Sequence, residues 1–270
     1  MCKICVLKRP MIIVPNNGKR AVSQKGAYWK NGDTLDIYVY SAARRYLDDI
    51  RFAYEHWLRN TSLKVNFDVA KKDSDIRIDF KPGGGSWSYV GTDALMIRKT
   101  DPTMSLGWEG LDVIYHEVGH SLGLLHEHQN PDVGIKWNAK VVKKELSGPP
   151  NNWDLASINS NVLRAVNPST VNYTSFDRDS VMLYFFPDSW TLDGKGTKEN
   201  PEPSLIDLEH VRKLYPEPNE LKDYLTHLPN LAHLHKEHII YTLERLGVEY
   251  DVRQTKKALL AILMKRISIN

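Results

Sequence analysis

Residues 116–126 read His-Glu-Val-Gly-His-Ser-Leu-Gly-Leu-Leu-His, and this stretch decides the fold and the chemistry that the sequence predicts. On a helix, residues four positions apart lie on the same face, so His116 and His120 can hold one cation between their imidazoles. Zinc binds imidazole nitrogen, and a catalytic zinc site takes three protein ligands and leaves a further position for water. The sequence therefore predicts a zinc site, with Glu117 beside the position of that water.

The third ligand has to come from beyond this helix, because a continued helix would carry residue 126 around the axis and away from the metal. Gly123 allows the necessary turn, since glycine ends helices well and reaches positive φ values without strain. The chain can then bring His126 back to the same cation. A bare His-Glu-x-x-His occurs by accident on amphipathic helices, but two further residues at fixed offsets make an accident improbable. The extended spacing resembles the signature of the metzincin metalloproteases.

The composition is that of an ordinary soluble protein. Its 270 residues are 41% hydrophobic, enough to bury one substantial core and a small second module. The net charge of +3, from 36 basic and 33 acidic residues, is too balanced to indicate nucleic acid or an anionic membrane as the main partner. The longest apolar run near the start, residues 11–14, is too short for a signal-peptide core or a membrane span. We therefore expect a cytoplasmic protein or one exported without a signal peptide.

The only cysteines are Cys2 and Cys5, and neither lies in a plausible core, so we expect no disulfide in the catalytic body. Three interpretations of this Cys-x-x-Cys pair stay open. The thiols are inert, or one thiolate caps the zinc in a latent form, or the pair serves redox chemistry or metal binding. The surrounding residues 1–27 are predicted to be an extended leader or pro-segment.

Alternating apolar residues predict three strands, at residues 35–39, 63–69 and 76–80, whose polar residues face solvent or a helix. Apolar residues at helical spacing predict a helix over residues 41–59. Residues 103–106 are predicted to form the last, exposed strand before the zinc helix, where an extended peptide could be added to the sheet.

A glycine run at residues 83–85 leads into a short aromatic strand. It resembles a phosphate-binding loop only superficially, since no Lys-Ser or Lys-Thr follows it. After His126 the chain is polar and irregular to about residue 170, which predicts loops and short helices. A helix over residues 205–214 is followed by Tyr-Pro-Glu-Pro, and we expect the catalytic domain, residues 28–216, to end there.

Residues 219–270 are predicted to form a helical C-terminal module, with helices at about 239–246 and 257–266. This module resembles, more weakly, the helix-extended loop-helix modules of the SAP and LEM kind. Two interpretations stay open: a surface that binds nucleic acid or protein, or a helical pair that covers the catalytic domain. The tail also carries several histidines that we interpret as solvated helix residues rather than a second metal site, namely His227, His233, His235 and His238.

Over residues 28–216 the chain resembles the astacin-like metzincins. Glu127 follows the third histidine directly, as in astacins, and residues 180–184, Ser-Val-Met-Leu-Tyr, resemble the family's methionine turn with its tyrosine. The segments 87–91 and 205–216 also resemble astacin segments. The resemblance implies an α+β metzincin zincin fold, with a mixed twisted sheet, an active-site helix and a mostly irregular C-terminal subdomain. The small helical appendage is additional.

The resemblance also implies a zinc-dependent endopeptidase acting on protein or peptide substrates, with one catalytic zinc ion. It makes His116, His120 and His126 the zinc ligands and Glu117 the general base and then acid. Tyr184 would bind the zinc in an empty cleft and swing away to stabilise the oxyanion when substrate is present.

Some features differ from the usual family pattern. Astacins are usually secreted with a pro-segment and two disulfides, and neither a signal peptide nor those cysteines is visible here. The residues that follow His128 lack the arginine common in animal members, so the chain resembles a bacterial-type branch. By the same resemblance, Met182 would pack beneath the metal as an apolar floor. Two interpretations from other classes stay open: a binding protein with a latent protease domain, and a regulatory protein whose thiolate holds the zinc permanently.

Overall fold

The computed structural model describes residues 27–149, 151–165, 175–217, 236, 239–240, 243 and 248–268. Cys2, Cys5, most of the predicted leader, the tail histidines and most of the predicted 239–246 helix lie outside the described residues. The chain divides into two compact units. The first is Met1–Trp29, Leu35–Trp57 and Val65–His210; the second is Lys30–Thr34, Leu58–Lys64 and Val211–Asn270.

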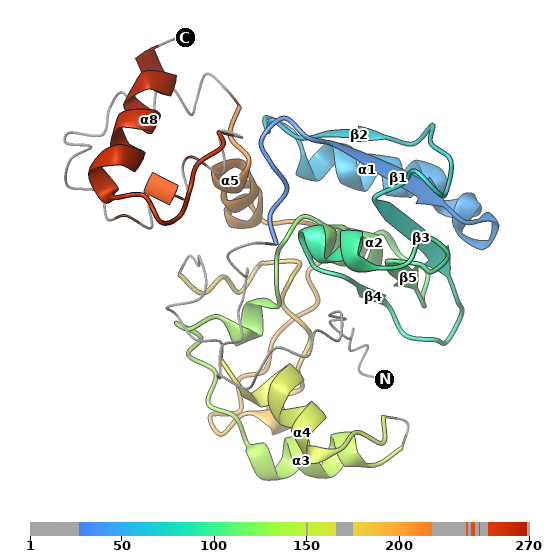
Figure 1. Cartoon of the computed structure of the whole chain (residues 1–270). Coiled ribbons are helices and arrows are strands. Elements are labelled where there is room, and N and C mark those ends of the chain that lie inside the picture. Colours follow the sequence, from blue (N-terminus) through green and yellow to red (C-terminus); the bar gives the residue numbers. More distant parts are fainter. Residues whose placement is uncertain are drawn as a thin grey trace. The chain divides into compact units, whose positions relative to one another are not determined.

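The chain forms a five-stranded sheet of order β2-β1-β3-β5-β4 (Figure 1). Its strands are β1 (Thr34–Val39), β2 (Lys64–Asn66), β3 (Ile76–Phe80), β4 (Trp87–Ser88) and β5 (Met104–Leu106). β1, β3 and β5 run parallel, and β4 pairs antiparallel with β5. The mixed sheet of the predicted α+β fold is therefore confirmed, although β2 is shorter than the predicted strand at 63–69.

The prediction that residues 103–106 form the exposed edge is wrong. β5 lies between β3 and β4, and all its residues are buried. The outer strand on this side of the sheet is β4, which comes earlier in the sequence. The order of strands in the sheet differs from their order in the chain, so alternation along the sequence could not reveal which strand lies at the edge.

β3 is the central strand, and its polar residue Arg77 is fully buried instead of facing solvent. The guanidinium donates to main-chain carbonyls around it: Nε to Asp101 at 2.7 Å, Nη1 to Ser74 at 3.0 Å and Nη2 to Ile97 at 3.3 Å. A buried arginine is tolerated where its donors are satisfied in this way. Arg77 thus ties residues 97–101 to β3.

The predicted helix over 41–59 is a 3-10 helix, Ser41–Tyr46, followed by α1, Leu47–Trp57. Asp48 and Asp49 stand in the first turn of α1, where they interact favourably with the helix dipole. The zinc-motif helix is α2, Leu111–Ser121, which is buried from Val113 onward. α1 holds α2 in place through hydrogen bonds from Trp57 Nε1 to the Tyr115 carbonyl, 3.0 Å, and between the Tyr54 and Ser121 hydroxyls, 2.8 Å.

Beyond α2 the first unit has loops and short helices, as predicted. The described ones after α2 are the 3-10 helices Glu127–Gln129 and Asp188–Trp190, the α-helices α3 (Ala139–Ser147) and α4 (Leu155–Ile158), and the π-helix Asn159–Leu163. A further 3-10 helix, Gly91–Met96, precedes β5. Apolar side chains of the segments after α2 form a separate buried cluster of Val142, Leu146, Ile158, Val162, Tyr184, Phe186 and Trp190. Tyr184 therefore belongs to a packed core and lines the active-site pocket as well.

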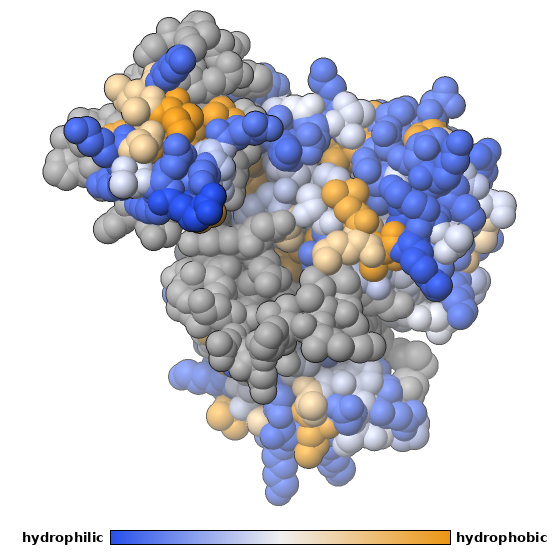
Figure 2. Space-filling model, viewed as in Figure 1, coloured by the Kyte–Doolittle hydropathy of each residue, from blue (hydrophilic) through white to orange (hydrophobic). Residues whose placement is uncertain are grey.

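α5 has the predicted bounds, Leu205–Leu214, and α8, Lys256–Ser268, extends the predicted 257–266 helix. The C-terminal segment has its own small core of Ile239, Leu243, Leu259 and Leu263. No helix in the described part of the chain has the length and apolarity that a bilayer span requires. On the face seen in Figure 2, the described residues are mostly hydrophilic, with apolar side chains in smaller groups between them.

Candidate active site and metal centre

The turn after α2 brings the third histidine back, as the sequence predicts. Gly123 has φ +98°, in the left-handed region that favours glycine. Its amide donates to the His120 carbonyl at 2.9 Å, and the Leu124 amide donates to the Gly119 carbonyl at 3.0 Å. These two hydrogen bonds are the Schellman arrangement that ends a helix. The helix therefore ends at Ser121, one residue after His120, and the chain reverses toward His126.

The three imidazoles of His116, His120 and His126 are buried and gathered, with ligand nitrogens all within 4.8 Å of one another. Nδ1 of His116 bonds to the Val181 carbonyl at 2.8 Å, and Nδ1 of His120 to the Leu124 carbonyl at 2.8 Å. A carbonyl only accepts, so each Nδ1 must carry the proton and each Nε2 a lone pair. The carbonyls thus fix the tautomers that metal binding needs.

The donor set fits zinc. Nε2 of His116 is buried and has no hydrogen-bond partner among the described residues. A buried polar atom without a partner costs free energy unless a ligand, such as a metal ion, binds to it. Burial lowers the pKa of the His116 imidazole to about 4, so the ring is neutral and can bind a cation. Nε2 of His120 and of His126 lie 3.0 Å apart, and imidazole nitrogens are preferred zinc ligands.

The methionine turn, residues 180–184, packs against the helix that carries His116 and His120. Met182 is buried, and a Cβ added to Gly119 of α2 would lie 2.5 Å from its sulfur, so the thioether packs directly against the helix between two histidines. The main-chain amide of Val181 donates to Asp207 Oδ2 at 2.9 Å, while its carbonyl accepts from His116. Asp207 also accepts from the Ser180 hydroxyl at 2.7 Å. Asp207 of α5 therefore holds the Val181 peptide group, and the carbonyl of that group orients the His116 ring.

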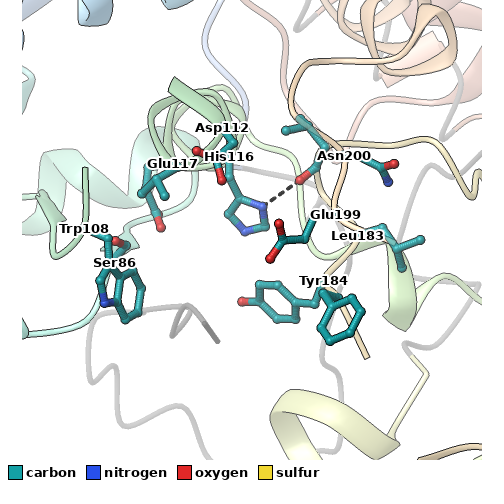
Figure 3. Close-up of a pocket in the computed structure, with 12 residues that line it drawn as sticks. Ser86, Trp108, Asp112, His116, Glu117, Leu183, Tyr184, Glu199 and Asn200 are labelled. Carbon is teal, nitrogen blue, oxygen red and sulfur yellow. Dashed lines mark hydrogen bonds between the residues drawn. The ribbon is translucent and has the colours of Figure 1, made fainter. Parts of the chain in front are cut away.

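The centre opens into a pocket of about 640 Å³, including the part open to solvent. Figure 3 shows Glu117, His116 and Tyr184 on its walls, and the dashed line marks the His116 hydrogen bond to the Val181 carbonyl. Glu117 is fully buried, one residue along α2 from His116. The Tyr184 hydroxyl lies within hydrogen-bonding distance of His126 Nε2. Each residue predicted for the site is therefore at this one place.

The half-buried Glu127 and the buried His128 follow His126, and both have structural partners that the sequence did not predict. Glu127 accepts from the Asp177 amide at 2.9 Å and from the Asn130 side chain at 2.9 Å, and burial raises its pKa to about 7. His128 bonds through Nε2 to the Asn161 carbonyl at 2.8 Å, and its ring lies 5.1 Å from that of Tyr184. Burial lowers the pKa of His128 to about 4, so its ring is a neutral packing surface for the tyrosine.

The glycine run places the edge strand beside the pocket. The Gly83 amide donates to the Gly107 carbonyl at 3.0 Å, and a Cβ on Gly107 would lie 2.5 Å from the backbone of Gly85. Only two bare backbones can approach so closely. The loop that precedes β4 is thus fastened to the residue that follows β5, and Ser86 Oγ completes the contact by accepting from the Gly107 amide at 3.0 Å.

Comparison with known proteins agrees with this geometry. The sequence model of the peptidase family Astacin matches residues 21–197. The chain is 32% identical over 122 residues to Zinc metalloproteinase nas-36 of Brugia malayi, covering 43% of this chain and 19% of that protein. It is 29% identical over 170 residues to Astacin-like metalloprotease toxin 1 of Loxosceles intermedia, covering 62% of this chain and 57% of that protein. It thus spans less than two thirds of the length of these curated relatives.

A solved structure, that of myroilysin, superimposes with a TM-score of 0.68 at 27% sequence identity, covering 72% of this chain and 98% of that one. A second myroilysin crystal structure gives a TM-score of 0.56 at 26% identity, covering 80% of this chain and 92% of that one. The likeness therefore extends over most of the fold as well as over the histidine motif. Since the family match also covers well over half of the sequence, the chain belongs to the astacin family of peptidases.

Proposed function

We propose that this chain is a zinc-dependent endopeptidase that hydrolyses peptide bonds in proteins. The observation that carries the proposal is one pocket lined by His116, Glu117 and Tyr184, with the nitrogens of the three histidines within 4.8 Å of one another. The names of the relatives, zinc metalloproteinase and metalloprotease toxin, support the same reaction class.

In this proposal His116, His120 and His126 hold the ion. Zinc, when bound, lowers the pKa of its water to about 7 and polarises the carbonyl to be attacked. Glu117 takes the proton from the attacking water, and it later delivers that proton to the leaving amine. Its complete burial serves both steps, because a carboxylate away from bulk water interacts more strongly with a proton donor beside it.

Tyr184 is proposed to donate from its hydroxyl to the oxyanion that develops on the substrate, and to ligate zinc when the cleft is empty. Its ring packs in the cluster around Phe186 and Trp190, and this packing places the hydroxyl beside His126.

Replacing Tyr184 with phenylalanine should lower kcat by roughly 10²-fold with a smaller change in KM, because the lost hydrogen bond forms only as charge develops. Steady-state kinetics on a peptide substrate checks this. Phe186→Leu, a change in the same cluster without a hydroxyl, serves as the packing control. A Tyr184→Phe variant that keeps wild-type kcat would remove the oxyanion role.

We propose that β4, and not β5, holds the substrate. β4 is an outer strand that pairs antiparallel with β5, and an outer strand can take an extended peptide as an added strand. The peptide that pairs antiparallel with β4 would run in the same direction as β5, which ends at Leu106 immediately before the pocket wall at Trp108.

Metal removal tests the function as a whole. The zinc-loaded full chain should hydrolyse casein, lose that activity after incubation with a chelator, and regain it when one equivalent of zinc is added, because the metal activates the water. Release of new peptides, followed by mass spectrometry, is the measurement. Hydrolysis that continues in protein with no measurable zinc would contradict the proposal, and so would a zinc-loaded chain that cleaves no protein.

A further inference from the structure

One wall of the pocket carries a carboxylate that the reaction above does not use. Glu199 lines the same pocket as His116, Glu117 and Tyr184, although it comes from the loop before α5. In Figure 3 its side chain points toward the part of the pocket where His116 and Tyr184 lie. An acidic group there faces whatever part of a substrate enters beside the metal centre.

The backbone on both sides of Glu199 is fastened to the methionine-turn segment. The Thr197 amide donates to the Phe186 carbonyl at 3.0 Å, and the Thr197 hydroxyl bonds to the Tyr184 carbonyl. On the other side, the Asn200 side chain donates to the Ser180 carbonyl at 2.9 Å. The backbone position of Glu199 is therefore tied to the active site and not to a free surface loop.

The charges around the pocket are unbalanced. Among the residues that the structure describes, its lining includes the acids Asp112, Glu117 and Glu199 and no lysine or arginine. The neighbouring cation, Lys198, forms an ion pair with Asp179 at 2.6 Å. Within the described ranges no ion pair of Glu199 is present. Even with a zinc ion at the three histidines, the wall at Glu199 carries a carboxylate that suits a cationic side chain.

The place of the pocket along the sheet decides which substrate residue enters it. The pocket is also lined by Ser86, just before β4, and by Trp108, just after β5. A peptide antiparallel to β4 runs along the direction of β5, so its C-terminal half leaves the sheet at this end. The pocket therefore receives the side chain that follows the scissile bond.

We propose that Glu199 is a specificity-determining residue that selects lysine or arginine directly after the scissile bond. This inference rests on the proposed endopeptidase function. The apolar stem of such a side chain would lie along Val113, Leu183 and Phe185, and its charged end would meet the Glu199 carboxylate. Glu199 acts on the choice of substrate and takes no part in the bond cleavage itself.

The test uses the zinc-loaded full chain and sets of peptides that differ only in the residue after the scissile bond: lysine, arginine, glutamine or glutamate. Competition within one mixture, read by mass spectrometry, gives ratios of kcat/KM that do not depend on the active fraction. We expect lysine and arginine to exceed glutamine by roughly five- to ten-fold, as a partly exposed ion pair allows. High salt should reduce this ratio.

Glu199→Gln should bring the lysine-to-glutamine ratio to about one, and Glu199→Lys should favour the glutamate peptide instead. Glu202→Gln, a neighbouring exposed carboxylate outside the pocket, should keep the wild-type ratio. Hydrolysis with no preference for a basic residue, or an unchanged ratio in Glu199→Gln, overturns the inference while the endopeptidase function stands. A wild-type chain that cleaves none of the peptides, nor casein, overturns the function and the inference with it.

Discussion

Glu117→Gln should lower kcat/KM for peptide hydrolysis by about 10³- to 10⁴-fold while the protein keeps its zinc, because a glutamine of the same shape cannot accept the proton of the attacking water. The side chain is fully buried beside His116, so no bulk water can readily replace it as base. Glu117→Ala should lose at least as much activity.

The measurement pairs single-turnover hydrolysis with elemental analysis of the same sample, so that a lost base is separated from a lost metal. Glu55→Gln, an exposed carboxylate on α1, is the matched control and should behave as wild type. A Glu117→Gln protein with full zinc content and activity within tenfold of wild type would mean that another group takes the proton.

His120→Ala should reduce zinc affinity by more than about 100-fold and abolish hydrolysis, because one of three ligands is lost. The same change removes a fully buried ring whose Nδ1 bonds to the Leu124 carbonyl, so we also expect the free energy of unfolding to fall by about 2–4 kcal/mol without metal. The loss should therefore appear even in the apoprotein.

Competition with a chromophoric chelator gives the zinc affinity, and urea unfolding in excess chelator gives the free energy of unfolding. His56→Gln is a suitable control, since His56 bonds to the Tyr115 hydroxyl and is not one of the three gathered histidines. Equal zinc stoichiometry in His120→Ala and wild type would remove His120 from the ligand set.

The site residues could be named from the sequence because zinc ligands on a helix obey a local spacing rule. His116, His120 and the turn at Gly123 lie within a few residues of one another, and the geometry that joins them is helix geometry. The positions of Met182 and Tyr184 could be inferred only from the family resemblance, since no local rule links them to a helix some 60 residues earlier.

The parts that could not be predicted depend on contacts between distant segments. Strand alternation does not show that β4 lies outside β5. It predicts polar residues that face solvent or a helix, and it does not show that main-chain carbonyls surround the buried guanidinium of Arg77. The supporting groups of the histidines are main-chain carbonyls, which every residue has. Glu199 lies in a loop where any carboxylate would be assigned to the surface.

The pairing of Asp207 with the Val181 peptide group sets a minimum length for a chain that keeps the proposed site intact. The family match ends at residue 197, yet the carboxylate that orients the His116 ring, through Val181, lies ten residues further on, in α5. A polypeptide that ends at residue 197 would retain all three predicted zinc ligands and still lack the carboxylate that positions one of them. α5 therefore supports the proposed site from outside the pocket, and any excised domain has to include this helix.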